Sequence, residues 1–290
     1  MKRIVALSLG ALLVLTAASC RKKSTPEPVA VPVTFTASMD GYQVKATDVS
    51  FEDGDAIGVF ALDPFDRINV RGTVTGSSVN LATPFNWENI DKAVFLGCYP
   101  YDANLRDVNW SFSVRTDQRT YAEYRSSDLR SAKTQAERGS TVALVFQHRL
   151  SKLTVNAVCE DASDEVTAVT LGGLVIDARV DLTAPSAQAG TNRADIKAGK
   201  ATSANGNTGF VAILVPQALT RLPLTVTTKN GQTLTFEPAA PLTFEEGYAY
   251  KADLTVPKPE TPAAPLTFTY SVTDWEDDTG GMTFTETEGN

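Results

Sequence analysis

The stretch VALVFQHRLSKLTVNAV, residues 142–158, decides the fold class of this chain. Residues 142–146 are apolar, and residues 150–158 alternate apolar with polar side chains, with β-branched residues in both. Runs of this kind predict β-strands. The polar break at 147–149 separates them, so we place a domain boundary near residues 149–151, where one strand ends and the next begins a second domain.

The rest of the chain repeats this pattern of short strand-like runs between turn residues. Further runs occupy residues 33–37, 57–62, 93–99, 166–169, 210–215, 222–228, 234–236, 248–256 and 266–272. Clusters of Gly, Asn, Asp and Pro separate them, which is typical of all-β sandwiches. Only residues 126–138 are rich in helix formers, and there we expect a short helix or a loop. The prediction is an all-β chain with two tandem β-sandwich domains.

The first twenty residues resemble a bacterial lipoprotein signal. Lys2 and Arg3 precede an apolar run, and small residues then lead to Cys20. The apolar segment is shorter than the roughly twenty residues that a transmembrane helix needs, so we expect cleavage before Cys20 and lipidation of its thiol. Ala17 stands where such signals usually have Leu or Val. The alternative is an ordinary signal-peptidase site with a free thiol nearby.

Two Pro-rich segments, 21–32 and 257–265, divide the rest of the chain. Such composition is typical of tethers and linkers. The predicted organisation is a signal peptide (1–19), a lipidated tether (20–32), an N-terminal β-sandwich (33–150), a C-terminal β-sandwich (151–256) and a Pro-rich linker with a C-terminal segment (257–290). A strand on its own linker is free to leave the sheet that precedes it.

Composition limits the function further. Without the signal peptide the chain has 24 basic and 34 acidic residues, a net charge of −10. Nucleic-acid binding needs clustered positive charge, so we exclude it. Two cysteines remain, Cys98 and Cys159. An exported protein can form a disulfide, but we place these two in different domains and expect buried free thiols.

Neither a catalytic nor a metal-binding pattern is present. His148 is the only histidine, so a Ser-His-Asp or Cys-His site would have to use it. It ends an apolar run, where we expect a hydrogen-bonded structural role. The acidic clusters at 52–55 and 274–278 lack the spacing of an EF-hand. We expect a turn at the first and a solvated end at the second, with no enzyme activity and no cofactor.

Four aromatic residues support a second hypothesis. Trp87, Trp110, Tyr121 and Tyr124 would form a platform on which sugars stack, and the chain would then be a glycan-binding surface lipoprotein that does not polymerise. Alternatively, these rings are core or rim residues of the first sandwich, which is the commoner role of large aromatic side chains.

Eight short stretches, spread over nearly the whole mature chain, resemble the fimbrillin family of the Bacteroidales. The most specific are GDAIGVF (54–60) and VFQHRLSKL (145–153). The others are VTFTA (33–37), FLGCYPY (95–101), DQ (117–118), SDL with AK (127–129 and 132–133), GYAY (247–250) and VTDW (272–275). Their order and spacing carry the resemblance.

The resemblance implies two transthyretin-like sandwiches and assembly by strand exchange. A trypsin-like protease would remove the first strand, and a terminal strand of the next subunit would fill the groove that is left. The removable strand would carry Val33, Phe35 and Ala37 inward. The cut would fall at Lys45 or Arg67, although Lys45 lacks the Thr-Arg context often seen in the family.

The donor strand would then come from the C-terminal segment. Leu266, Phe268, Tyr270 and Val272 share one face at period two, with residues 282–285 as an alternative donor.

The implied partners are other fimbrial subunits in a head-to-tail polymer, outer-membrane lipid bound through Cys20, and a host or bacterial surface ligand. The implied location is the outer membrane and then the fimbrium at the cell surface, in adhesion or biofilm formation. A stalk, an anchor and a tip subunit all fit the sequence.

Overall fold

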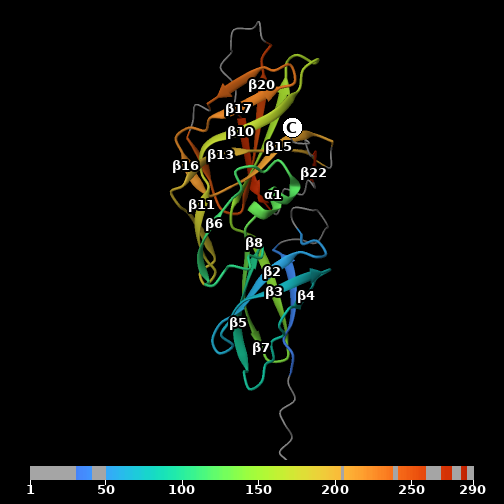
Figure 1. Cartoon of the computed structure of the whole chain (residues 1–290), viewed down its shortest axis with the longest axis vertical. Helices are drawn as coiled ribbons and strands as arrows, with labels where there is room; N and C mark the ends of the chain where they lie inside the picture. The colour runs from blue at the N-terminus through green and yellow to red at the C-terminus, as the bar shows by residue number, and fades with distance from the viewer. Residues whose placement is uncertain are drawn as a thin grey trace, which may run out of the picture.

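The computed structural model describes residues 31–40, 50–203, 206–237, 241–258, 269–275 and 282–285. In this part of the chain nearly all regular structure is β-strand, as predicted, beside one short helix, α1 (Tyr121–Ser127). The strands form two regions that follow one another along the long axis (Figure 1). Among the described residues, the structure has no helix that is long and apolar enough to span a membrane.

The first region is a closed barrel of seven strands. Their order around the barrel is β1 (Thr34–Met39), β4 (Ser78–Leu81), β3 (Arg67–Thr75), β2 (Ala56–Ala61), β5 (Lys92–Tyr99), β7 (Arg130–Glu137) and β8 (Thr141–His148). All neighbours are antiparallel except β1 and β8, which run parallel and close the barrel. Closure removes the free strand edges that a sheet otherwise exposes.

Period-two alternation fills the barrel with apolar side chains. In β8 the residues alternate between solvent and interior, and Val142, Leu144 and Phe146 are fully buried. Phe95 of β5 and Trp87 meet edge to face inside the barrel, with ring centroids 5.7 Å apart. Such aromatic pairs stabilise a core beyond the area that they bury. The interior is therefore a packed core, to which every strand contributes its inward face.

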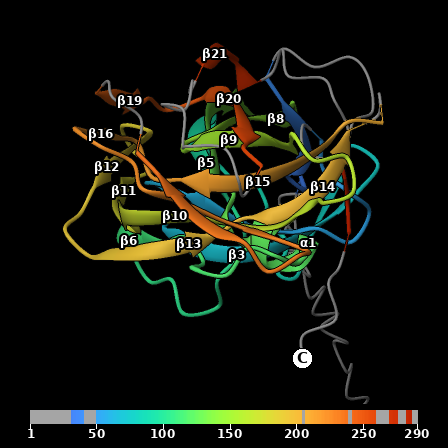
Figure 2. The same cartoon turned by 90° about the horizontal axis from the view of Figure 1, so that it is seen from above.

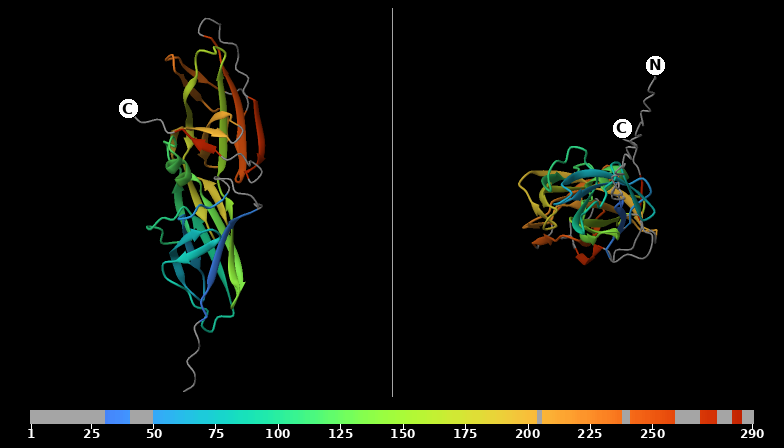
Figure 3. Two further views of the ribbon diagram at one scale, coloured as in Figure 1. Left: turned by 90° about the vertical axis from the view of Figure 1, so that its right-hand side faces the viewer. Right: turned by 90° about the horizontal axis from the view of Figure 1, so that it is seen from below.

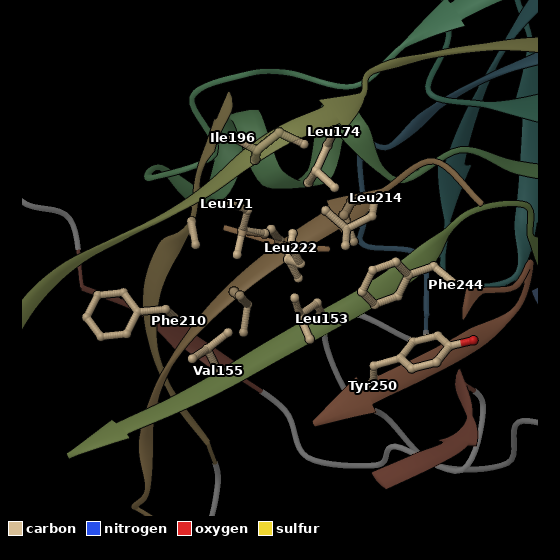
Figure 4. Packing of buried hydrophobic residues seen from close by; sticks show 14 of the residues in the cluster. Leu153, Val155, Leu171, Leu174, Ile196, Phe210, Leu214, Leu222, Phe244 and Tyr250 are labelled. Carbon is tan, nitrogen blue, oxygen red and sulfur yellow. The ribbon is translucent and has the colours of Figure 1, made fainter. Parts of the chain in front are cut away.

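The second region contains two larger sheets. The six-stranded sheet has the order β21 (Thr269–Asp274), β20 (Tyr248–Val256), β9 (Ser151–Cys159), β15 (Thr208–Leu214), β14 (Gly199–Ser203) and β22 (Met282–Phe284). The four-stranded sheet has the order β13 (Arg193–Lys197), β10 (Val166–Val175), β17 (Leu224–Thr228) and β18 (Thr233–Phe236). Figure 4 shows the core that they share, with Leu153 and Leu214 from the first sheet and Leu171 and Ile196 from the second.

Two smaller sheets complete the second region. One consists of β12 (Ser186–Ala189), β11 (Asp177–Asp181) and β6 (Asn109–Ser113), and the other of β16 (Gln217–Leu219) and β19 (Leu242–Phe244). Viewed from above, β6, β11 and β12 lie together on one side (Figure 2). In the sequence β6 lies between two barrel strands, yet it pairs with β11 along its whole length. The chain thus leaves the barrel after β5 and returns at β7.

The expected helix or loop at residues 126–138 is wrong. Residues 130–137 form β7, and the helix α1 precedes it. The helix formers in β7 are overridden because the strand pairs with β5 over its full length, and such tertiary contacts outweigh local propensity. The helix instead begins at Thr120, whose hydroxyl accepts a hydrogen bond from the Glu123 amide at 3.3 Å.

Candidate functional site

The first candidate site is the space that β1 fills between β4 and β8, which we call the β1 site. β1 pairs with β8 over all six of its residues, from Thr34 opposite Thr141 to Met39 opposite Phe146. On the other side it pairs with β4 only at Phe35 and Thr36. Figure 3 (left) shows β1 lying along the side of the barrel. The strand is therefore held firmly by β8 and closes the barrel through a short contact with β4.

The inward residues of β1 are part of the barrel core. Val33, Phe35, Ala37 and Met39 are buried, and the residues between them face outward. The Phe35 ring meets the Phe95 ring edge to face, with centroids 5.3 Å apart. Removal of β1 would thus open a groove lined by aromatic and aliphatic side chains and would expose the edges of two strands.

The structure describes only one of the two expected cut sites. Lys45 lies outside the described residues. Arg67 is exposed at the start of β3, where it pairs with Ala61 of β2. A cut at Arg67 would detach β2 together with β1, although Ile57 and Val59 of β2 are fully buried.

The second candidate site is formed by the C-terminal strands at the two edges of the six-stranded sheet. β21 pairs antiparallel with β20, with Val272 opposite Tyr250. Val272 is 45% exposed, and Ser271 and Thr273 are exposed as well. Main-chain pairing therefore contributes more than side-chain burial to holding this part of β21 in place. Leu266 and Phe268 lie outside the described residues.

The other edge carries β22, which pairs with β14. Phe284 packs against Tyr124 and Tyr121 of α1, with ring centroids 5.0 Å and 5.5 Å apart. Gly199 makes room for it, because a Cβ atom at residue 199 would lie 2.3 Å from the Phe284 ring. β22 is thus fixed by an aromatic contact, whereas the exposed residues of β21 are not.

A buried cluster with polar members connects the two regions, because His148 at the end of β8 contacts Trp275 directly after β21. Trp275 is fully buried and stacks on His148, with ring centroids 3.8 Å apart and an angle of 7° between the planes. His148 Nδ1 lies 2.8 Å from Asp128 Oδ1, and Arg130 forms an ion pair with Asp128 at 2.6 Å. Trp275 is therefore buried and not solvated as predicted, whereas residues 276–278 of the same acidic cluster lie outside the described residues. The hydrogen-bonded structural role predicted for His148 is confirmed.

Electrostatics keep this cluster charged. Burial by itself would raise the pKa of the Asp128 carboxyl, but the charge of Arg130 and the hydrogen bonds from Arg130 and His148 outweigh it and lower that pKa to about 2. Arg130 also lies 3.9 Å from Met39 Sδ at the end of β1. The cluster consequently contacts Met39, the last residue of β1, and includes Trp275, which follows β21.

The acidic turn at 52–55 is confirmed as a structural element. Asp55 accepts a hydrogen bond from the Glu52 amide at 2.8 Å, and Gly54 has a positive φ of 98°. Arg125 of α1 forms ion pairs with both Glu52 and Asp55, at 2.7 and 2.6 Å. Within the part of the chain that the structure describes, no cluster of three or more His, Cys, Asp or Glu side chains has the arrangement of a metal site.

Cys98 and Cys159 are both free, as expected, but only Cys98 is buried, whereas Cys159 is partly exposed. Burial raises the pKa of Cys98 to about 12, so its thiol is protonated at neutral pH and is a poor nucleophile.

The four aromatic residues do not form a single platform. Trp87 is fully buried in the barrel, and Tyr124 is buried in the other core. Trp110 and Tyr121 are partly buried and also pack against that second core. Trp87 is therefore a core residue of the first region, as the alternative predicts, whereas the other three residues pack against the core of the second region.

The chain is an elongated β protein of two regions. The first region is a closed barrel, and the second consists of packed sheets with C-terminal strands at the two edges of the largest sheet. A family model described as fimbrillin-like matches residues 45–275, so the chain belongs to the fimbrillin-like family.

Solved structures share this fold. A provisionally assigned cell adhesion protein of Bacteroides uniformis is 21% identical, with a TM-score of 0.66 over 85% of this chain and 99% of its own. A similarly assigned protein of Bacteroides ovatus is 18% identical, with a TM-score of 0.66 over 85% and 97%. One of Bacteroides fragilis is 14% identical, with a TM-score of 0.52 over 85% and 98%. No curated protein matches the chain.

Proposed function

We propose that this chain is a subunit of a cell-surface fimbria that assembles by exchange of β-strands between neighbouring copies. Membership of the fimbrillin-like family and the adhesion assignments of the structural neighbours support this role. They favour a non-enzymatic adhesive or structural protein. The same proposal includes two tandem transthyretin-like domains, at residues 33–150 and 151–256. Strand β6 of the first domain would then pair with β11 in a sheet of the second domain.

The observation that carries the proposal is the position of β1. It is the first described strand, it closes the barrel, and its four inward side chains are buried. A strand that is added between two others gains affinity from main-chain hydrogen bonds and register from alternate side chains. Loss of β1 would leave a binding site of this type, with the exposed edges of β4 and β8 as its walls.

The C-terminal segment matches the β1 site in sequence. β1 and its preceding residue place Val33, Phe35, Ala37 and Met39 inward at period two. The segment repeats this spacing with Leu266, Phe268, Tyr270 and Val272, and a phenylalanine is the second of the four apolar residues in both sets. A donor strand with the same period fills the same pockets. A second copy of the chain thus supplies a complementary strand.

We place the cut at Lys45 rather than Arg67. Lys45 follows β1, so cleavage there detaches β1 alone. Cleavage at Arg67 would also detach β2, which pairs with both β3 and β5 and is largely buried. Only the first cut leaves a barrel with one strand missing. Removal of β1 would also release the body from the lipid on Cys20, which anchors the precursor in the outer membrane.

The test compares two exposed neighbours on β21. Val272→Lys places a charge on the face that enters the β1 site, whereas Thr273→Lys places it on the opposite face. After trypsin nicking, the proposal expects polymers from Thr273→Lys and the parent but none from Val272→Lys or from protein lacking residues 266–290. Size-exclusion chromatography and electron microscopy measure this. If nicked protein without residues 266–290 forms the same polymers, strand donation by this segment is wrong.

The mass of the N-terminal peptide on cells distinguishes the types of subunit. A peptide that begins after Lys45 indicates a polymerised stalk or tip subunit. A lipidated peptide that begins at Cys20 indicates an anchor subunit.

A further inference from the structure

The outer face of the three-stranded sheet β6–β11–β12 carries a row of polar side chains from all three strands. Arg179 lies at the centre of the sheet, directly opposite Ser111 on β6 and Gln188 on β12. All three residues are exposed. Adjacent strands in a sheet are about 4.8 Å apart, so the row presents a hydroxyl, a guanidinium and an amide within the width of one or two sugar rings.

These three side chains are not used by the fold. In the part of the chain that the structure describes, Ser111, Arg179 and Gln188 form neither side-chain hydrogen bonds nor ion pairs. Polar side chains on other exposed sheet faces bond to each other, as Thr225 does with Thr235 at 3.4 Å. The row on β6–β11–β12 therefore keeps its donors and acceptors available to a ligand.

The row lines a hollow of about 770 Å³, to which Trp110 and Asp177 also contribute. Ligand sites typically measure about 300–1,000 Å³ and contain a small number of well-placed polar groups. None of the residues that line this hollow belongs to the barrel strands, so it is separate from the β1 site.

The carboxylate of Asp177 is fixed at the edge of this hollow. Its Oδ1 atom accepts a hydrogen bond from the Asn192 amide at 2.8 Å. Its Oδ2 atom lies against Gly190, where a Cβ atom would come within 2.1 Å. The glycine thus makes room for the carboxylate. One oriented carboxylate beside an available guanidinium forms an acceptor and donor pair that suits the hydroxyl groups of a sugar.

We propose that this face binds a neutral carbohydrate. Asp177 accepts hydrogen bonds from ring hydroxyls, and Arg179 and Gln188 donate to hydroxyl oxygens. The charge of the face favours a neutral ligand, because Asp177 and Asp181 lie two residues to either side of Arg179 on the same strand face. With two carboxylates against one guanidinium, an anionic ligand is disfavoured.

The experiment uses the full mature chain before protease treatment, so its result is independent of strand exchange. Affinity electrophoresis in gels that contain yeast mannan, dextran or arabinoxylan measures binding, with polygalacturonate as the acidic comparison. Arg179→Ala and Gln188→Ala remove side chains that the fold does not use. Arg221→Ala is the matched control, because it removes an equally charged, exposed arginine that lies in the loop before β17 and is paired with Glu237.

We expect at least one neutral polysaccharide to retard the protein. Arg179→Ala should weaken that binding about tenfold and Gln188→Ala about threefold, as expected for lost hydrogen bonds, while Arg221→Ala should match the parent. Equal melting temperatures establish that the variants are folded. Lack of retardation by all three neutral polymers overturns the proposal, as does retardation by polygalacturonate alone or an equal loss in Arg179→Ala and Arg221→Ala.

Discussion

The strands β1 and β21 lie near opposite ends of the chain, and they are held in opposite ways. β1 has a partner on each side and buries every inward side chain, including Phe35 at 4% exposure. β21 has a partner on one side, and Val272 is 45% exposed. The barrel depends on its first strand for closure, whereas Ser271, Val272 and Thr273 of β21 are exposed and add little apolar burial to the six-stranded sheet.

This contrast explains why assembly would need a protease. A strand that is buried on one face and bonded along the whole of one edge does not leave spontaneously on a useful timescale. An edge strand with exposed side chains opens locally at much lower cost. Cleavage after β1 would therefore be the controlling step, and release of β21 would follow without a second trigger.

The largest predicted effect compares truncations in these two strands. Phe35→Ala removes a ring packed against Phe95 and should cost about 3–5 kcal/mol of unfolding free energy. Val272→Ala should change that free energy by less than about 0.5 kcal/mol, because the side chain is exposed. Urea denaturation of both variants measures this. Equal losses would show that β21 is as important to the fold as β1.

The buried cluster between the two strands predicts a pH dependence. Folding lowers the pKa of Asp128 from an ordinary value of 3.8 to about 2. The unfolded chain therefore binds this proton at a higher pH than the folded chain does. The stabilisation, roughly 2–3 kcal/mol, is complete above about pH 5 and is lost as the pH falls through about 4 to 2.

Urea unfolding from pH 6 to pH 2 tests this prediction. Asp128→Asn should flatten the curve between about pH 4 and 2. The matched control is Asp253→Asn on the exposed face of β20, which should leave the curve unchanged. An Asp128→Asn curve with the parent's slope would assign the acid sensitivity to other groups.

The smallest predicted effect concerns Trp275 and the end of β21. Trp275→Ala removes the ring that stacks on His148 and should speed hydrogen exchange of the β21 amides by about tenfold or more. The β1 amides should keep their protection. Mass spectrometry of peptides from both strands measures the difference. Faster exchange in β1 to the same degree would mean that the two strands open together.

The sequence predicted individual strands well where it has continuous apolar runs. Residues 93–99 and 142–146 lie within the observed β5 and β8. It missed β6 and the run from β11 to β14, whose short segments are polar. Of these, β6 and β14 pair with strands that are distant in the chain, β11 and β22. The Thr120 and Glu123 pair was a capping signal that would have located α1.

The candidate sites were predictable only where they follow the chain. Period-two spacing indicated the inward faces of β1, and the inward orientation of Val33, Phe35 and Ala37 is observed. The cluster of Asp128, His148 and Trp275 has no local pattern, because its members are far apart in the sequence. The row on β6–β11–β12 likewise depends on pairing between remote strands, which sequence periodicity does not reveal.

The central claim is that the C-terminal segment fits the β1 site, and a peptide measures this directly. Protein that is cut after Lys45 and lacks residues 266–290 is mixed with a peptide of residues 266–274, and its melting temperature and peptide binding are followed. We expect the peptide to displace β1 from the nicked protein, to bind one to one and to raise the melting temperature, whereas the same peptide with Phe268→Lys does none of these. Equal behaviour of the two peptides, or no binding by either, would contradict this claim.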